Sequence, residues 1–330
     1  MNKSLIFFSF LSFLLFALRA ENPSRVESTT HLGFAAYRIS DGHTHAVVVP
    51  ELAGRVMLYG KVDGPNLIYN TRGKTADSPR EGFVNWGGDK TLVGPHGVWL
   101  THSPNSLWPP RPSWMSEAHE ARVEDEGRRL VTTGPVWEGF GLRMIREYSY
   151  TDNGALEIRQ TLEKVNDAPE MMTIWSVSQV EEPDEVFVLR NPESKYVGSH
   201  VYSNKHHAFM PMESVSEELF SLRFAPGRAV KISFDSPVAA LAARWGDTMW
   251  IQRGKLTQGK GFSNSALEVF PVELYTQGHA EGNYVELELM SPAVRLVKDE
   301  PATFTLYWSL HDAGKEPETI MQLLKESPSE

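Results

Sequence analysis

Hydrophobic and polar positions alternate in short runs along most of the chain, and this pattern predicts β-strands. In LEIRQTLE, residues 156–163, every second side chain from Leu156 falls on one side and charged residues dominate the other. A period of two is expected of a strand with one buried face. The Asp152-Asn153-Gly154 sequence just before it is a hairpin-turn signal. Residues 142–165 are therefore predicted to form an antiparallel hairpin.

Further strands are predicted where apolar or β-branched runs end at Gly, Pro, Asn or Asp. Together with the hairpin, the predicted strands cover residues 45–50, 55–60, 66–70, 129–137, 142–151, 155–165, 172–180, 185–190, 229–234, 248–254, 266–276, 284–290 and 302–310. A helix is predicted only at residues 316–326. Many short strands separated by turns predict an all-β fold, a large antiparallel β-sandwich built as one domain over residues 21–330.

The first twenty residues differ from this pattern. A basic start with Lys3 is followed by 14 apolar or small residues, Leu5 to Leu18, and by Ala20. This order is typical of a secretory signal peptide and is short for a membrane span, which needs about 20 residues. We therefore expect residues 1–20 to be removed and the protein to be exported, periplasmic or extracellular, with no membrane span in the mature chain. A retained N-terminal anchor is the alternative.

Composition narrows the function classes. The chain of 330 residues is 41% hydrophobic and 22% charged, and it carries a net charge of −10. Removing the signal removes Lys3 and Arg19, so 30 basic residues stand against 42 acidic ones and the charge becomes −12. An acidic chain disfavours nucleic acid as a partner. The absence of cysteine excludes disulfides, thiolate zinc sites and a cysteine nucleophile. The histidine-containing runs lack metal-ligand spacing, so no metal site is predicted.

A stretch from Asn85 to Trp114 breaks the alternation, because it shows neither a helical nor a strand period. It holds four of the nine tryptophans and is rich in Pro and Gly. Tryptophan rings stack on sugar faces, and Gly87 and Gly88 would let the backbone approach a ligand closely. The stretch is therefore interpreted as a stiff aromatic loop at a carbohydrate site, with packing at the end of the sandwich as the alternative.

Three stretches resemble the galactose mutarotase-like superfamily: PELAGRVMLYG with GPNLIYN, the hairpin and following strand over residues 142–180, and GNYVELELMSPAVRLVKDEPATFTLYWSL. The likeness covers roughly residues 31–312. The segment NWGGDKTLVGPHGVW with WPP resembles an uncharacterised branch, a domain family of unknown function. The resemblance implies a large antiparallel β-supersandwich with a concave sugar-binding face.

The resemblance also implies a chemistry, proton transfer at the anomeric centre of a sugar by one base and one acid. In YVELELM, Glu286 and Glu288 share one strand face, and Glu288 is close to the position of the epimerase base. The acid of the family is a histidine on the middle strand, where Ser178 or Gln179 stands here. His96 is the predicted substitute.

The predicted catalytic residues are thus Glu288, Glu286 and His96. The predicted substrate-binding residues all come from the aromatic stretch: Trp86, Asp89, Lys90, Trp99, His102, Trp108 and Arg111. The ligand would be a small or oligomeric carbohydrate, no cofactor is required, and the activity would be that of an aldose 1-epimerase-like isomerase. The alternatives are a non-catalytic carbohydrate-binding protein and an accessory domain on the same fold.

Overall fold

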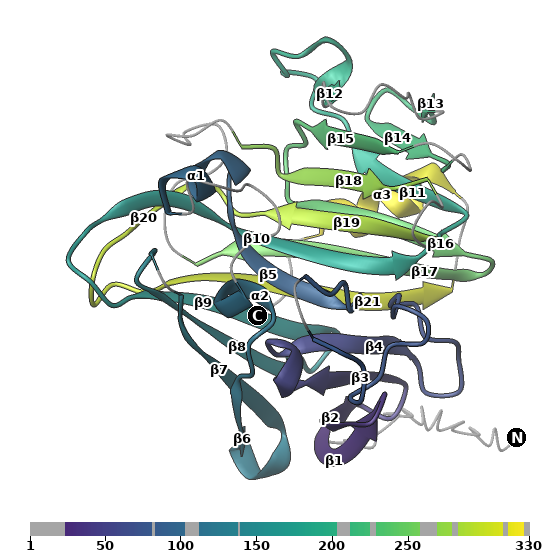
Figure 1. Ribbon diagram of the computed structural model, residues 1–330. Helices are drawn as coiled ribbons and strands as arrows, with labels where there is room; N and C mark the ends of the chain where they lie inside the picture. Colours follow the sequence, from purple (N-terminus) through teal and green to yellow (C-terminus); the bar gives the residue numbers. More distant parts are fainter. Residues whose placement is uncertain are drawn as a thin grey trace, which may run out of the picture.

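The computed structural model describes residues 24–80, 83–102, 112–137, 139–202, 212–224, 229–257, 269–278, 283–312 and 316–326. Within this part of the chain, two large antiparallel sheets face each other (Figure 1). The predicted signal segment, residues 1–20, lies outside the described residues. No helix in the described ranges is long and apolar enough to cross a membrane.

The first sheet runs in the order β1-β2-β3-β4-β5-β10-β19-β18-β15-β12, with β20 beside β10. Its strands are β1 (Arg25–His31), β2 (Phe34–Ser40), β3 (Thr44–Val49), β4 (Arg55–Lys61), β5 (Asp89–Gly94), β10 (Glu170–Glu181), β12 (His200–Tyr202), β15 (Val230–Phe234), β18 (Val272–Thr276), β19 (Tyr284–Met290) and β20 (Val294–Leu296).

The second sheet runs in the order β13-β14-β11-β16-β17-β21-β9-β8-β7-β6. Its strands are β6 (Glu120–Glu124), β7 (Arg129–Trp137), β8 (Leu142–Tyr150), β9 (Leu156–Lys164), β11 (Glu185–Leu189), β13 (Met212–Ser214), β14 (Leu219–Leu222), β16 (Ala240–Trp245), β17 (Thr248–Leu256) and β21 (Ala302–Asp312). The predicted hairpin is β8 paired with β9, which confirms the all-β antiparallel fold and its central turn.

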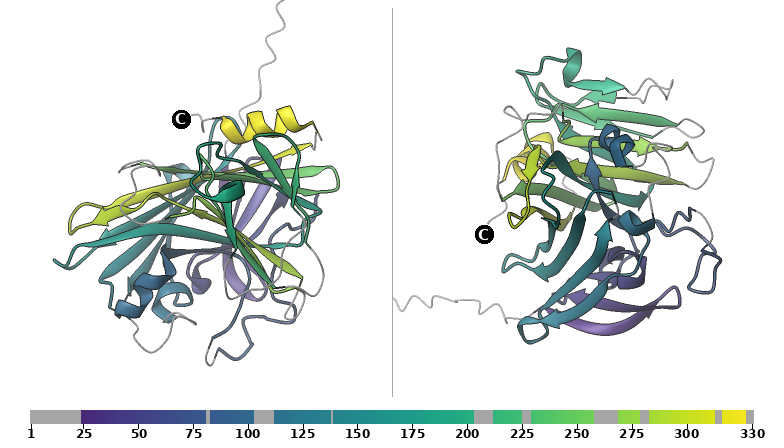
Figure 2. Two further views of the ribbon diagram at one scale, coloured as in Figure 1. Left: turned by 90° about the horizontal axis from the view of Figure 1, so that it is seen from above. Right: turned by 60° about the vertical axis from the view of Figure 1, so that its left-hand side comes forward.

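Most of the buried apolar side chains fill the space between the two sheets and form one large cluster. At its centre Tyr59 of β4 packs on Trp250 and Trp308 of the second sheet, with ring centroids 5.0 and 5.2 Å apart. The predicted C-terminal helix is α3 (Pro317–Lys325), which covers the outside of β11, β16 and β17 with Ile320 and Leu324 (Figure 2). Two short helices, α1 (Trp99–His102) and α2 (Pro112–Met115), follow β5 in the chain.

Two sequence expectations about strands are wrong. Residues 66–70 form only the isolated bridges Ile68–Val180 and Asn70–Gly87. The Asn66 side chain accepts the backbone N–H groups of Tyr59 and Ile68 and donates to the Met57 carbonyl, and so replaces ladder hydrogen bonds.

The second correction concerns the aromatic stretch, because six of its residues form β5, a central strand of the first sheet. All six residues of β5 are buried. A strand buried on both faces does not alternate between apolar and polar residues, so its sequence lacks the period of two. The described part of the stretch therefore contains a core strand, with irregular backbone before it and the short helix α1 after it.

Candidate functional site

The two polar residues at the start of β5 point to opposite faces of the first sheet. Asp89 turns inward, where its Oδ1 atom lies 2.6 Å from Nη2 of Arg146 on the second sheet. Lys90 turns outward, where its Nζ atom lies 3.3 Å from Oε1 of Glu286. Successive side chains of a strand point to opposite faces of the sheet, so the inward direction of Asp89 fixes the outward direction of Lys90. We call the side of the first sheet that faces away from the second sheet the outer face.

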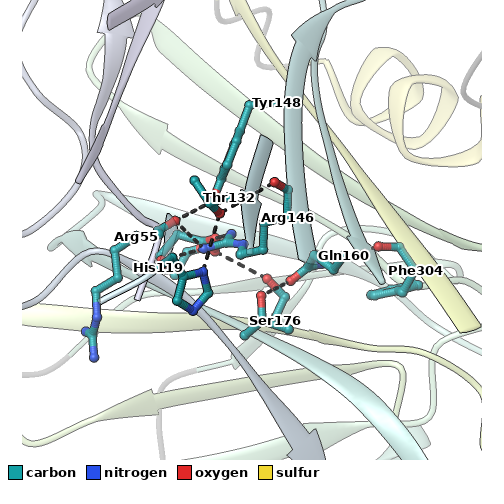
Figure 3. A network of polar contacts seen from close by, with 12 residues as sticks. Arg55, His119, Thr132, Arg146, Tyr148, Gln160, Ser176 and Phe304 are labelled. Atoms are coloured by element: carbon teal, nitrogen blue, oxygen red, sulfur yellow. Dashed lines mark hydrogen bonds and ion pairs between the residues drawn. The ribbon is translucent and has the colours of Figure 1, made fainter. Parts of the chain in front are cut away.

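The inward side holds a buried polar network (Figure 3). Arg146 and the Tyr148 hydroxyl both donate to the carbonyl of Gly54, and the Thr132 hydroxyl lies 3.4 Å from Nδ1 of His119. Burial, with Arg146 nearby, lowers the pKa of His119 to about 3, so this ring is neutral at physiological pH. The network is enclosed in the core between the two sheets, where it supports the fold.

On the outer face, strand register aligns a row of side chains across four strands. Lys90 of β5 lies opposite Val177 of β10, Val177 opposite Glu288 of β19, and Glu288 opposite Glu273 of β18. Residues directly opposite in an antiparallel pair share a face. The prediction that Glu286 and Glu288 share one strand face is confirmed by this register, in which Glu286 lies opposite Gln179.

Glu288 is fully buried. This is unusual, because its strand neighbours Leu287 and Leu289 face the core, and a carboxylate on the opposite face would ordinarily be in solvent. Lys231 places Nζ 2.6 and 2.5 Å from its two oxygens, and the Trp175 indole donates to Oε2 at 2.8 Å. Lys231 also lies 2.7 Å from Glu273. Burial raises the pKa of Glu288 to about 8, with Lys231 opposing the shift and the charges of Glu273 and Glu286 adding to it.

Glu286 lies beside this group and is held by two partners. The Lys90 ammonium and the Gln179 amide nitrogen both donate to its Oε1 atom, at 3.3 and 2.8 Å. Burial lowers the pKa of Lys90, although Glu286 partly offsets the effect. The Gln179 side-chain oxygen is buried and has no hydrogen-bond partner among the described residues. The Gln179–Glu286 pair therefore leaves the Gln179 oxygen as an unused acceptor next to the Glu286 carboxylate.

His96 reaches the same group through tryptophan rings. Its ring centroid lies 4.4 Å from that of Trp99 and 6.1 Å from that of Trp175, the side chain that donates to Glu288. His96 and Glu288 thus both lie beside the Trp175 indole. The sequence brought these two residues together as candidates, and their catalytic roles stay a prediction.

The tryptophans of the aromatic stretch that the structure describes are packing groups. Trp86 is 2% exposed and packs edge-on against Phe34, and Trp99 is fully buried with its indole nitrogen bonded to the Val93 carbonyl. Trp114 packs between Trp99 and Phe140. Their predicted role as sugar platforms stays a prediction.

Two further predicted residues, Asp89 and His102, do not join the outer-face group. Asp89 is turned into the core, away from Lys90. His102 bonds to Glu170 at the start of β10, and Glu170 lies seven residues, about 23 Å of strand, from Val177. Trp108 and Arg111 lie outside the described residues. The backbone approach at Gly87 is to Tyr69 of the same chain, whose carbonyl oxygen would lie 2.1 Å from an added Cβ.

Sequence reasoning missed Trp175, Lys231 and Glu273. Lys231 and Glu273 stand at polar positions of alternating strands, so the period of two could have placed each on the outer face. Nothing local in the sequence shows that the two strands are neighbours, which the register of β15 against β18 establishes. Among the described residues, no group of three or more His, Asp or Glu side chains could hold a metal ion.

No protein-family model matches the sequence, and no curated protein matches it. Solved structures do share its fold. A galactose mutarotase-like protein from Lactobacillus casei is 10% identical, with 87% of this chain and 100% of that chain covered and a TM-score of 0.55. A proposed aldose 1-epimerase from Escherichia coli K12 is 9% identical, with 88% and 100% covered and a TM-score of 0.54.

A TPR-domain-containing protein from Parabacteroides distasonis is 14% identical, with a TM-score of 0.56. The match covers 90% of this chain and 49% of that protein, so the chain spans about half of its length. Identities this low establish the fold and leave the activity open. The chain therefore has the galactose mutarotase-like β-sandwich fold that the sequence resemblance implied, and its placement in a particular branch stays a prediction.

Proposed function

We propose that the outer face of the first sheet binds a small or oligomeric carbohydrate beside Trp175. The observation that carries the proposal is the convergence of His96 and Glu288 on that indole. The side-chain oxygen of Gln179, which is buried and unpartnered among the described residues, becomes an acceptor for a ligand hydroxyl that inserts beside Trp175. A surface with an aromatic ring, a spare acceptor and paired carboxylates suits a ligand that is rich in hydroxyl groups.

The activity that we propose for this site is interconversion of sugar anomers. Glu288 accepts the proton of the anomeric hydroxyl, whose O–H electron pair forms the carbonyl as the C1–O5 bond breaks. The ring oxygen takes the bond's electrons and a proton from His96. Rotation and the reverse steps return both protons and give the other anomer. Because its pKa is raised to about 8, Glu288 acts as the base through its ionised fraction, which grows as the pH rises toward 8.

A non-catalytic carbohydrate-binding protein is the second candidate. Two observations favour it. Both oxygens of Glu288 are already bonded, and Ser178 or Gln179 stands where the resemblance places the catalytic histidine. In this candidate the Lys231–Glu288 pair persists when the ligand is bound.

Binding is tested by titrating a panel of free sugars and oligosaccharides while the indole N–H signals of the tryptophans are followed by NMR. The Trp175 signal is expected to shift, and the signal of Trp245, which bonds to the Glu181 carbonyl, serves as the internal control. Trp175→Phe keeps an aromatic ring, removes the N–H donor to Glu288 and is expected to weaken binding. A Trp175 signal that moves with no member of the panel contradicts the proposal.

We also propose that the protein is exported after removal of residues 1–20, as the basic start and short apolar run favour. Expression of the full-length chain in a bacterium, followed by fractionation and N-terminal sequencing, tests this. A new N-terminus at Glu21 in an exported fraction is expected. An intact N-terminus in the membrane fraction would support the retained anchor instead.

A further inference from the structure

Arg146 crosses the core to join two strands of the opposite sheet. Its Nη1 atom donates to the carbonyls of Gly54 and Asp89 at 3.0 and 3.2 Å, and Nη2 donates to the Asp89 carboxylate at 2.6 Å. Arg146 is 1% exposed and Asp89 is fully buried. Figure 3 shows this side chain at the centre of the polar network. One guanidinium therefore binds acceptors on two neighbouring segments of the first sheet, Gly54 before β4 and Asp89 at the start of β5. We call the boundary between these two strands the seam.

The seam lies between β4 and β5, and it is the weakest pairing in the middle of the first sheet. Among the described residues, the only register pair between these strands is Val56 opposite Asp89. Gly54 precedes β4 and Asp89 begins β5, so the fork of Arg146 takes the place of ladder hydrogen bonds that are missing there. The Tyr148 hydroxyl adds a second donor to the Gly54 carbonyl.

The residues that follow these two anchors are both cations on the outer face. Gly54 is followed by Arg55, which donates to the carbonyls of Gly87 and Met115 at 2.6 and 2.9 Å. Asp89 is followed by Lys90, which pairs with Glu286. A shift between β4 and β5 would move both cations relative to that carboxylate.

A stabilising role alone does not account for this arrangement. Replacing a buried ion pair with apolar residues of similar volume is often neutral or stabilising, so burial of Arg146 and Asp89 is weak evidence of added stability. The rigid, planar fork of arginine suits several fixed acceptors at once, which a lysine cannot reproduce. The two serines at 3.3 and 3.5 Å from the other Asp89 oxygen, Ser176 and Ser178, fix the carboxylate further.

We propose that Arg146 is a positioning residue, which acts through the core to set the spacing of Arg55, Lys90 and Glu286 on the outer face. Its consequence for ligand binding rests on the proposed function. Its structural content does not, because the Lys90–Glu286 pair exists in the free protein.

The test compares Arg146→Lys with the wild type by NMR of the lysine side-chain ammonium groups in the free, full-length protein. Lys90 is 4% exposed, so its ammonium protons are protected from solvent in the wild type. In Arg146→Lys the exchange of these protons with solvent is expected to accelerate about tenfold. This is the factor that corresponds to the free energy of one hydrogen bond to a charged group. Leu324→Ala, in the α3 cluster, is the control for lost stability alone and is expected to leave the Lys90 signal unchanged.

A folded Arg146→Lys protein with Lys90 exchange equal to that of the wild type would overturn the proposal. If that variant does not fold, Asp89→Asn decides, because the amide keeps the volume of the carboxylate and removes its charge. Faster Lys90 exchange in Asp89→Asn supports the proposal, and unchanged exchange overturns it. Failure of every sugar to bind would refute the proposed function and leave this result intact.

Discussion

Glu288→Gln should make the stability of the protein less dependent on pH. Burial raises the pKa of Glu288 from the ordinary 4.5 to about 8. Between these values the folded protein holds a proton that the unfolded chain has released, so the free energy of unfolding falls as the pH rises. A glutamine does not titrate and resembles the protonated acid in shape and in hydrogen bonding, so the variant escapes this loss.

The magnitude follows from the same shift. Each pH unit is worth at most about 1.4 kcal/mol, and the full interval from 4.5 to 8 is worth at most about 5 kcal/mol. Lys231 stays paired in the variant, because it also lies 2.7 Å from Glu273. The free energy of unfolding of Glu288→Gln minus that of the wild type should therefore increase steadily from pH 5 to pH 8.

The assay is urea unfolding followed by far-ultraviolet circular dichroism at pH 5, 6, 7 and 8. Equal m-values in the two proteins would show that both expose the same surface on unfolding. Glu163→Gln removes a glutamate from the solvent side of β9 and is the control for loss of one charge. Parallel curves for Glu288→Gln and the wild type, within about 0.5 kcal/mol at each pH, would refute the reasoning.

Three further predictions concern the fold that supports the site. His119→Asn should make the free energy of unfolding less sensitive to acid. The pKa of His119 is lowered to about 3, so the wild type loses up to about 1.4 kcal/mol of this free energy per pH unit as the pH falls below 6.5. Urea titrations at pH 4–7 check this. Gly87→Ala should cost more than 1 kcal/mol, because its φ is +79° and the new Cβ would meet the Tyr69 carbonyl oxygen at 2.1 Å; a thermal midpoint equal to that of the wild type contradicts this. Leu324→Ala should cost about 2–5 kcal/mol as a buried truncation in the α3 cluster, and a loss below 1 kcal/mol in urea would show that α3 is not packed as described.

The sequence predicted the strands that alternate or that form apolar runs between turn residues, which are β3, β4, β7, β8, β9, β10, β11, β15, β17, β18, β19 and β21. It did not mark out β1, β2, β6, β12, β13, β14, β16 and β20. It failed at β5, where both faces are buried and the period disappears. It failed again at residues 66–70, where Asn66 satisfies the backbone through its side chain. Neither failure reflects weak local propensity, since both depend on where the segment lies in the finished fold.

The candidate site divides in the same way. Alternation placed Glu286 and Glu288 on one face, as the register confirms. Asp89 and Lys90 were both predicted to bind substrate, but adjacent residues of a strand point in opposite directions, and Asp89 faces the core. The partners of Glu288 come from β10 and β15, 113 and 57 residues away, so only the sheet order brings them together.

The most direct test of the account is NMR magnetisation exchange between the α and β anomers of a sugar panel, with the wild type, Glu288→Gln and the control Glu163→Gln. The account predicts that the wild type and the control speed exchange for at least one sugar, and that Glu288→Gln does so at least about a hundredfold less, as expected for loss of a general base. Line broadening without faster exchange would support the binding protein. Acceleration that persists in Glu288→Gln would contradict the assignment of Glu288 as the base.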